Sequence, residues 1–335
     1  MTVAVIGAGS WGTAVAKIVA QNGPTVLWAR RPELAQTISS THENPEYLPG
    51  VRLPDSLRTS ASIPAVCGNA TVVVLAVPSH GLRAVLEEAR PVISANVPIV
   101  SLAKGIEQGT LRRMTEVVAD VLEGHNTDCI GVLTGPNLAK EVAAGQPTAS
   151  VVATRDAAVA ERLQQLFFAP TFRVYTNPDV IGCEIAGALK NVLAIGAGVA
   201  DGLGYGDNTK AALMTRGLAE LARLGVALGG DPLTFAGLAG MGDLIATCSS
   251  PQSRNRHVGV ELGRGRPLAE ILTEMNMVAE GVKSTAAVLE LAARHDVEMP
   301  LASFVGRVLY DNAKPSDLIP ELMLRKAKPE LHGMR

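Results

Sequence analysis

The stretch Gly7-Ala8-Gly9-Ser10-Trp11-Gly12 follows an apolar run over residues 3–6 and leads into a helical pattern over residues 11–22. This G-x-G-x-x-G spacing is typical of a dinucleotide-binding turn. Gly7 makes the tight turn, Gly9 lets the backbone approach a pyrophosphate, and Gly12 permits close contact between helix and strand. The helix N-terminus favours the phosphates. The alternative is a glycine-rich turn that binds no ligand.

The residues after the second predicted strand, 25–29, indicate which cofactor binds. NAD sites usually place an acidic residue there for the ribose hydroxyls. This chain has Arg30 and Arg31 instead, and its first acid is Glu33. Two guanidinium groups suit a 2′-phosphate, so we expect NADPH, with NADH possible. Alternatively, these arginines are surface charges or stack on adenine and tolerate both cofactors.

The first half of the chain alternates apolar strands with helical patterns. The expected strands are 3–6, 25–29, 72–77, 98–102, 130–134, 149–153 and 172–175, and the expected helices are 11–22, 82–89, 111–122, 138–144 and 157–168. Continuous apolar strands alternating with helices indicate a parallel sheet that is covered on both faces. We therefore predict an α/β protein that begins with a Rossmann-like, doubly wound, mainly parallel sheet over residues 1–178.

The pattern changes after Asn177-Pro178. Residues 181–200 are apolar nearly all round, as in a helix buried within a domain. Further helical patterns follow and strand signals vanish. We predict a C-terminal all-α domain over residues 179–335 that binds substrate and carries out catalysis.

Composition narrows the classes of function. The chain has 335 residues, a net charge of −2 and few aromatic residues. This argues against nucleic acid as a partner. No apolar run is long enough to suggest a membrane span, and no residue cluster suggests a metal site. Four widely spaced cysteines fit a reducing, cytoplasmic location. A large apolar helical domain also suggests a homodimer.

Two lysines occupy unusual positions. Lys104 follows the predicted strand 98–102, at the carboxyl end where ligands bind in such sheets. Lys190 lies in an apolar helix, where burial would lower its pKa and suit it to proton transfer. Asp243, flanked by apolar residues, could be the partner of Lys190. The alternatives are a lysine that extends to the surface and a helix-capping aspartate.

A candidate anion site follows. Ser253 is a good helix N-cap, and Arg254 begins the next helical pattern. Free backbone N–H groups beside a guanidinium suit a phosphate. The alternative is a solvated basic loop.

The segment GALKNVLAIGAGVADGLGYGDN at residues 187–208 resembles the signature of NAD(P)-dependent glycerol-3-phosphate dehydrogenases of the bacterial type. Similar blocks include GPNLAKEV at 135–142 and GLAGMGDLIATCSSPQSRNRHVG at 237–259, and the resemblance covers nearly the whole chain. It implies reversible reduction of dihydroxyacetone phosphate to sn-glycerol 3-phosphate, a precursor of glycerophospholipids.

The resemblance also implies roles for individual residues. Lys190 would be the general acid/base, Lys104 would stabilise the oxyanion near cofactor and substrate, and Asp243 would orient Lys190. The implied substrate-binding residues are Lys104, Gly135, Asn137, Lys190, Asn191, Asp243, Thr247, Ser253, Arg254 and Asn255. Besides the glycines, the implied cofactor-binding residues are Ser10, Trp11, Arg30, Arg31, Lys104, Ala139, Arg254, Val278 and Glu280.

Two other functions remain open from the sequence alone. One is another two-domain dehydrogenase of the β-hydroxyacid type, because a helix N-terminus with Arg254 would also accept a carboxylate. The other is a cofactor-binding sensor without catalysis. The sensor predicts a damaged Lys190 or Arg254, and both residues are present.

Overall fold

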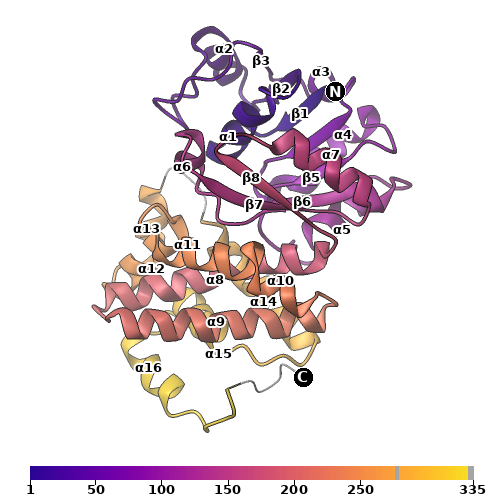
Figure 1. Ribbon diagram of the computed structural model, residues 1–335. Helices are drawn as coiled ribbons and strands as arrows, with labels where there is room; N and C mark the ends of the chain where they lie inside the picture. Colours follow the sequence, from indigo (N-terminus) through magenta and orange to yellow (C-terminus); the bar gives the residue numbers. More distant parts are fainter. Residues whose placement is uncertain (276–278, 331–335) are drawn as a thin grey trace. The chain divides into compact units, whose positions relative to one another are not determined.

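The computed structural model describes residues 1–275 and 279–330 (Figure 1). The chain forms two compact units. The first consists of Met1–Ala103 and Met114–Val180, and the second of Lys104–Arg113 and Ile181–Arg335. We call residues 104–113 the Lys104 arm. The arm belongs to the second unit, although the chain on both sides of it belongs to the first.

An eight-stranded sheet forms the centre of the first unit, in the order β3-β2-β1-β4-β5-β6-β7-β8 (Figure 1). Its strands are β1 Val3–Ile6, β2 Thr25–Trp28, β3 Leu57–Ser60, β4 Val72–Leu75, β5 Ile99–Ser101, β6 Ile130–Thr134, β7 Thr148–Ala153 and β8 Phe172–Asn177. Its helices are α1 Ser10–Val19, α2 Pro32–Thr41, α3 Ile63–Cys67, α4 Leu82–Ala89, α5 Met114–Val121, α6 Ala139–Ala143 and α7 Ala157–Phe167.

Apolar side chains cover both faces of this sheet. On β1, Val3 and Val5 join a core with α1, α2 and α7, whereas Ala4 and Ile6 join a core with α3, α4 and α5. Successive side chains of a strand point to opposite faces, so a strand buried on both faces must be apolar throughout. This explains the continuous apolar runs in the sequence.

The predicted fold class is confirmed, with differences in detail. The pair β6–β7 is antiparallel, while every other pair in the sheet is parallel. The helix expected over residues 111–122 begins only at Met114. The elements α2, β3 and α3 were not predicted. Because β3 is an edge strand with only Leu57 buried, its sequence lacks an apolar run.

The second unit is helical apart from the Lys104 arm (Figure 1). Its helices are α8 Val180–Gly202, α9 Asp207–Ala227, α10 Pro232–Ala236, α11 Asp243–Ser249, α12 Arg254–Gly263, α13 Leu268–Glu274, α14 Glu280–Arg294, α15 Pro300–Tyr310 and α16 Pro315–Met323. The first residue of α8, Val180, still belongs to the first unit.

Helix α8 is the core of the second unit. By length and composition it could cross a membrane, whereas the sequence analysis predicted a buried core helix over residues 181–200. However, 94% of its most apolar window is buried inside the protein. The core helix of a globular domain has the same character, because it contacts apolar side chains on all sides.

Helices α8 and α12 pack unusually closely. A Cβ atom on Gly198 would lie 2.0 Å from the carbonyl oxygen of Arg256, and one on Gly259 would lie 2.0 Å from that of Ile195. No larger residue fits at either position without moving a backbone. This close contact fixes the helix that carries Lys190 against the helix that begins at Arg254.

Candidate active site

The predicted dinucleotide turn lies directly after β1. Strand β1 lies between β2 and β4, where the order of the sheet reverses, and ligands bind at such switch points. Gly7 has φ of 125°, and a Cβ on Gly12 would lie 2.0 Å from the Gly7 carbonyl oxygen. A Cβ on Gly9 would have no neighbour within 4 Å. The turn therefore has the tight bend, the close contact and the open backbone that a pyrophosphate requires.

The first helical residues add polar groups to this turn. The Ser10 hydroxyl donates to the Tyr47 carbonyl oxygen at 2.5 Å. Among the described residues, the indole Nε1 of Trp11 is buried and has no hydrogen-bond partner. A buried donor without a partner is costly, and a bound ligand could supply the acceptor. These observations fit a dinucleotide cofactor.

Arg30 and Arg31 follow β2, and both are exposed. Arg31 forms an ion pair with Glu46, which raises the pKa of its guanidinium. In the part of the chain that the structure describes, the Arg30 side chain has no such partner. Arg30 is therefore the more available of the two for a 2′-phosphate.

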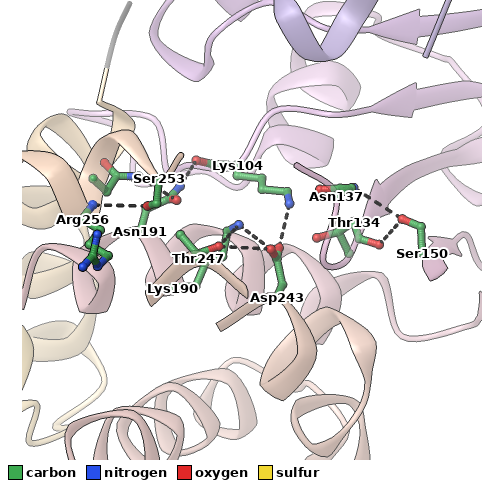
Figure 2. A network of polar contacts seen from close by, with 11 residues as sticks. Lys104, Thr134, Asn137, Ser150, Lys190, Asn191, Asp243, Thr247, Ser253 and Arg256 are labelled. Atoms are coloured by element: carbon green, nitrogen blue, oxygen red, sulfur yellow. Dashed lines mark hydrogen bonds and ion pairs between the residues drawn. The ribbon is translucent and has the colours of Figure 1, made fainter. Parts of the chain in front are cut away.

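Gly135, Asn137 and Ala139 follow β6 in the first unit. Gly135 has φ of 132°, and Ala139 begins α6. The Asn137 side chain donates to the Ser150 hydroxyl at 3.4 Å, and that hydroxyl donates to the Thr134 carbonyl oxygen at 2.7 Å (Figure 2). Ser150 was not among the predicted residues, since it is one of several serines in the chain with no distinguishing pattern.

In the second unit, Lys190, Lys104 and Asp243 meet in one network (Figure 2). The Lys190 Nζ donates to Asp243 Oδ1 at 2.5 Å and to Thr247 Oγ1 at 2.7 Å. The Lys104 Nζ donates to the other carboxylate oxygen, Oδ2, at 2.7 Å. Lys190 is 7% exposed and Asp243 is 1% exposed. Lys190 therefore does not extend to the surface, and Asp243 binds two lysines.

Burial and the neighbouring charges of this network lower the pKa of Lys190. Its pKa is lowered to about 8, mainly because burial disfavours the charged form and also because Lys104 is close. Asp243 opposes this shift by favouring the ammonium. A lysine with a pKa near neutrality can both donate and accept a proton at working pH.

The local fold explains how Asp243 reaches the lysines. A π-helical turn, Leu238–Gly242, comes directly before α11, and the Gly242 N–H donates to the Gly237 carbonyl oxygen at 3.1 Å. Such turns often occur at functional sites. Asp243 is the first residue of α11, and Thr247 lies one turn later on the same helix.

A second network links Asn191 and Asn255. Asn255 Nδ2 donates to Asn191 Oδ1 at 2.9 Å, and the Gly281 N–H donates to Asn255 Oδ1 at 2.9 Å. Asn191 Nδ2 donates to the carbonyl oxygen of Lys104 at 3.3 Å. This network joins α8, α12 and α14 to the Lys104 arm.

The predicted anion site lies at the first turn of α12. Ser253 is the N-cap of this helix, and its hydroxyl accepts from the Arg256 N–H at 3.2 Å. Arg254 is exposed, and its pKa is lowered by desolvation and raised by Glu280. Glu280 begins α14. Val278 lies outside the described residues.

Each unit thus supplies part of a recognisable enzyme. A doubly wound sheet with a dinucleotide turn, together with a helical unit that holds a buried, partnered lysine, defines an oxidoreductase of the two-domain nicotinamide type. Among the described residues, no group of His, Cys, Asp and Glu side chains is arranged to hold a metal ion.

Comparison with known proteins identifies the family. Residues 2–160 match the family model for the NAD-dependent glycerol-3-phosphate dehydrogenase N-terminus, and residues 179–320 match that for the C-terminus. The chain belongs to this family. Its membership confirms two predictions, an oxidoreductase with glycerol-3-phosphate dehydrogenase activity and an NAD(P) cofactor.

Individual relatives cover almost the entire chain. The chain is 54% identical over 332 residues to glycerol-3-phosphate dehydrogenase [NAD(P)+] 2 of Sphingopyxis alaskensis, covering 99% of both chains. It is 52% identical to glycerol-3-phosphate dehydrogenase [NAD(P)+] of Streptomyces griseus, covering 98% of this chain and 97% of the relative. A crystal structure of the Coxiella burnetii glycerol-3-phosphate dehydrogenase superposes with a TM-score of 0.91 at 38% identity, covering 97% of this chain and 99% of the other.

Proposed function

We propose that this enzyme reversibly reduces dihydroxyacetone phosphate to sn-glycerol 3-phosphate, with Lys190 as its general acid/base. The product supplies glycerophospholipid synthesis. The observation that carries this mechanism is the buried Lys190 ammonium, with a pKa of about 8 and hydrogen bonds to Asp243 and Thr247.

In this mechanism, each of three residues has a separate role at the substrate carbonyl. The reduced nicotinamide, when bound, supplies a hydride to the carbonyl carbon. Lys190 Nζ gives a proton to the carbonyl oxygen, and in the reverse reaction its neutral amine takes the hydroxyl proton. Lys104 stabilises the negative charge that develops on that oxygen. Asp243 orients both lysines, since each of its carboxylate oxygens accepts from one of them.

The phosphate of the substrate is proposed to bind at the start of α12. Arg254 supplies a guanidinium there, and Ser253 and Asn255 flank it. Asn191 and Thr247 hold neighbouring groups in place. Gly135 and Asn137 lie along the substrate in this proposal. The three cations Lys104, Lys190 and Arg254 outnumber the two carboxylates Asp243 and Glu280, and this excess of positive charge favours a dianionic phosphate over a neutral alcohol.

The cofactor is proposed to be NADPH, with NADH also accepted. Gly7, Gly9 and Gly12 would receive the pyrophosphate, with Ser10 and Trp11 beside it. Arg30 and Arg31 would bind the 2′-phosphate. Lys104, Ala139, Arg254, Val278 and Glu280 complete the proposed set. We assign nucleotide binding to residues 1–178 and substrate binding with catalysis to residues 179–335, together with the Lys104 arm.

The test is an assay of NADPH oxidation with dihydroxyacetone phosphate and with unphosphorylated dihydroxyacetone. We expect rapid oxidation with the first and little with the second. Arg254→Ala should raise KM for the phosphorylated substrate about tenfold or more, because a charge-assisted contact is worth about 1.5–3 kcal/mol. An unchanged KM would mean that the phosphate binds elsewhere. The same assay tests the 2′-phosphate contact. Arg30→Ala should raise KM for NADPH and leave KM for NADH nearly unchanged, and an unchanged KM for NADPH would contradict the contact.

We also propose a cytoplasmic homodimer. All four cysteines are buried and free, which fits a reducing compartment. Light scattering on the purified chain tests the dimer, and a monomer at micromolar concentration would contradict it. Fractionation of cells tests the location.

A further inference from the structure

The Lys104 arm inserts apolar side chains into the core of the second unit. Ile106 is 3% exposed and Leu111 is 6% exposed, and both belong to the core that includes Ile185, Leu189 and Val192 of α8. The arm is therefore packed against the helix that carries Lys190, although it continues directly from β5.

A buried ion pair holds the other end of the arm. Arg113 Nη1 donates to Glu184 Oε2 at 2.5 Å, and the two side chains are 13% and 5% exposed. Glu184 lies on α8, as do Lys190 and Asn191. The sequence contained a signal for this contact, because Glu184 is one of only three strongly polar residues within the apolar stretch 181–200. The proposed mechanism gives neither residue a role.

The two ends of the arm pair with each other, so that a restraint on one end also acts on the other. Ile106 and Arg113 form an antiparallel bridge, and the Glu107 N–H donates to the Arg112 carbonyl oxygen at 2.9 Å. Leu111 has φ of 57°, a left-handed conformation that is uncommon for a leucine. Such a conformation persists only where surrounding contacts impose it.

We propose that Arg113 and Glu184 are positioning residues, whose ion pair holds the Lys104 arm on α8 and so keeps the Lys104 ammonium on Asp243. The inference rests on the proposed function, in which Lys104 stabilises the reacting oxygen. Because Arg113 is bridged to Ile106, the ion pair at Arg113 also restrains the start of the arm, where Lys104 lies two residues before Ile106. At that end, Asn191 holds the Lys104 carbonyl oxygen and Asp243 holds its Nζ.

The test compares variants that release the anchor. Arg113→Met removes the ion pair but keeps the buried Glu184 carboxylate, so the double variant Arg113→Met/Glu184→Gln is made as well, because it removes both charges of the pair. Arg113→Lys retains the cation and should restore part of the loss. Glu321→Gln is the matched control, because it removes an exposed ion pair with Arg307 in the same unit.

The expected result has two parts. With dihydroxyacetone phosphate and NADPH, kcat of the first two variants falls about ten- to a hundredfold, as for a small displacement of a catalytic group. The pH at which reduction declines also moves upward, because Lys104 is one of the groups that lower the pKa of Lys190. Lys104→Met should shift it in the same direction. Combining Lys104→Met with Arg113→Met should cause little further loss.

Hydrogen exchange of the arm amides is measured on the same proteins, independently of activity. Faster exchange over residues 104–113 in the variants, with Glu321→Gln unchanged, supports the anchor. Folded variants with wild-type exchange, kcat and pH profile overturn the proposal. So does a loss of kcat that adds fully to that of Lys104→Met without a pH shift. A wild-type protein that does not reduce dihydroxyacetone phosphate refutes the proposed function instead. In that case the exchange rates over residues 104–113 still test whether the Arg113–Glu184 ion pair holds the arm.

Discussion

Lys190 owes its chemistry to three neighbours and to burial. Burial alone would favour a neutral amine, and the Asp243 carboxylate partly restores the ammonium. Lys104 occupies the second oxygen of the same carboxylate, so one buried anion holds two cations. The third neighbour is the Thr247 hydroxyl, which accepts from Nζ. With a pKa of about 8, Lys190 is close to the balance of protonated and neutral forms that its proposed role in a reversible reaction requires.

The pH dependence of both reaction directions should reflect this balance. In the proposed mechanism Lys190 donates a proton in reduction, so kcat/KM for dihydroxyacetone phosphate should fall as pH rises through about 8, and oxidation of glycerol 3-phosphate should rise over the same range. Steady-state assays over a range of about two pH units on each side of that pKa measure both limbs. Identical pH dependence in the two directions would contradict the assignment.

Asp243→Asn provides the control for that profile. Asp243 raises the pKa of Lys190, so its neutral replacement should move the decline in reduction to lower pH. The Lys104→Met variant should move it upward. A pair of opposite shifts is difficult to attribute to general damage, because damage has no preferred sign.

The sequence could predict Lys190 and Asp243 as partners because each is a charged residue within an apolar segment. It could not predict the link between Asn191 and Asn255, since amides carry no charge pattern and these two lie far apart in the chain. Their contact depends on the close packing of α8 and α12 at Gly198 and Gly259.

At the scale of helices, Glu220 links α9 to α15. Its carboxylate accepts from the N–H groups of Leu301 and Ala302, at 2.8 and 3.2 Å, at the start of α15. A carboxylate suits a helix N-terminus. Burial nevertheless raises the pKa of Glu220 to about 7, more strongly than the two hydrogen bonds lower it.

This raised pKa predicts a pH-dependent stability. Glu220 binds its proton more tightly in the folded state, so its stabilising contribution is complete below about pH 4.5 and is lost as pH rises through about 7. Glu220→Gln should therefore gain stability relative to wild type as pH rises between these values, on the order of 3 kcal/mol. Urea unfolding of both proteins at several pH values measures the difference.

Two features separate this effect from ordinary damage. A glutamine side chain at this position would still offer one carbonyl oxygen to α15 and would lose the second acceptor, which lowers stability equally at every pH. Glu290→Gln, at an exposed pair with Arg294 on α14, should give a difference that hardly changes with pH. A Glu220→Gln difference that is flat from pH 4.5 to 7 would refute the explanation.

In the first unit, two of the three strands and α-helices that the sequence did not predict are short; in the second unit it did not predict α10 and α16. Strand β3 and helix α3 have four and five residues, and β3 has little apolar alternation because it pairs on one side only. Helix α5 starts at Met114 and not at residue 111, because the Lys104 arm takes Leu111 into the other unit. Local patterns cannot reveal which core receives an apolar side chain.

For the whole molecule, strand and helix patterns were enough to predict an α/β half followed by a helical half. They did not reveal the antiparallel pair β6–β7, since an apolar strand reads the same in either direction. Nor did they reveal that the chain passes to the second unit at Lys104 and returns after Arg113. That passage places Lys104 with Lys190 on Asp243, where the proposed mechanism uses both lysines.

The central claim is that Lys190 transfers the proton during reduction of dihydroxyacetone phosphate. Its most direct test is the single-turnover rate of NADPH oxidation for wild type and Lys190→Met, with NADPH affinity measured on both. We predict a loss of about 10²–10⁴-fold in rate with NADPH affinity retained. A Lys190→Met rate equal to that of wild type would contradict the claim.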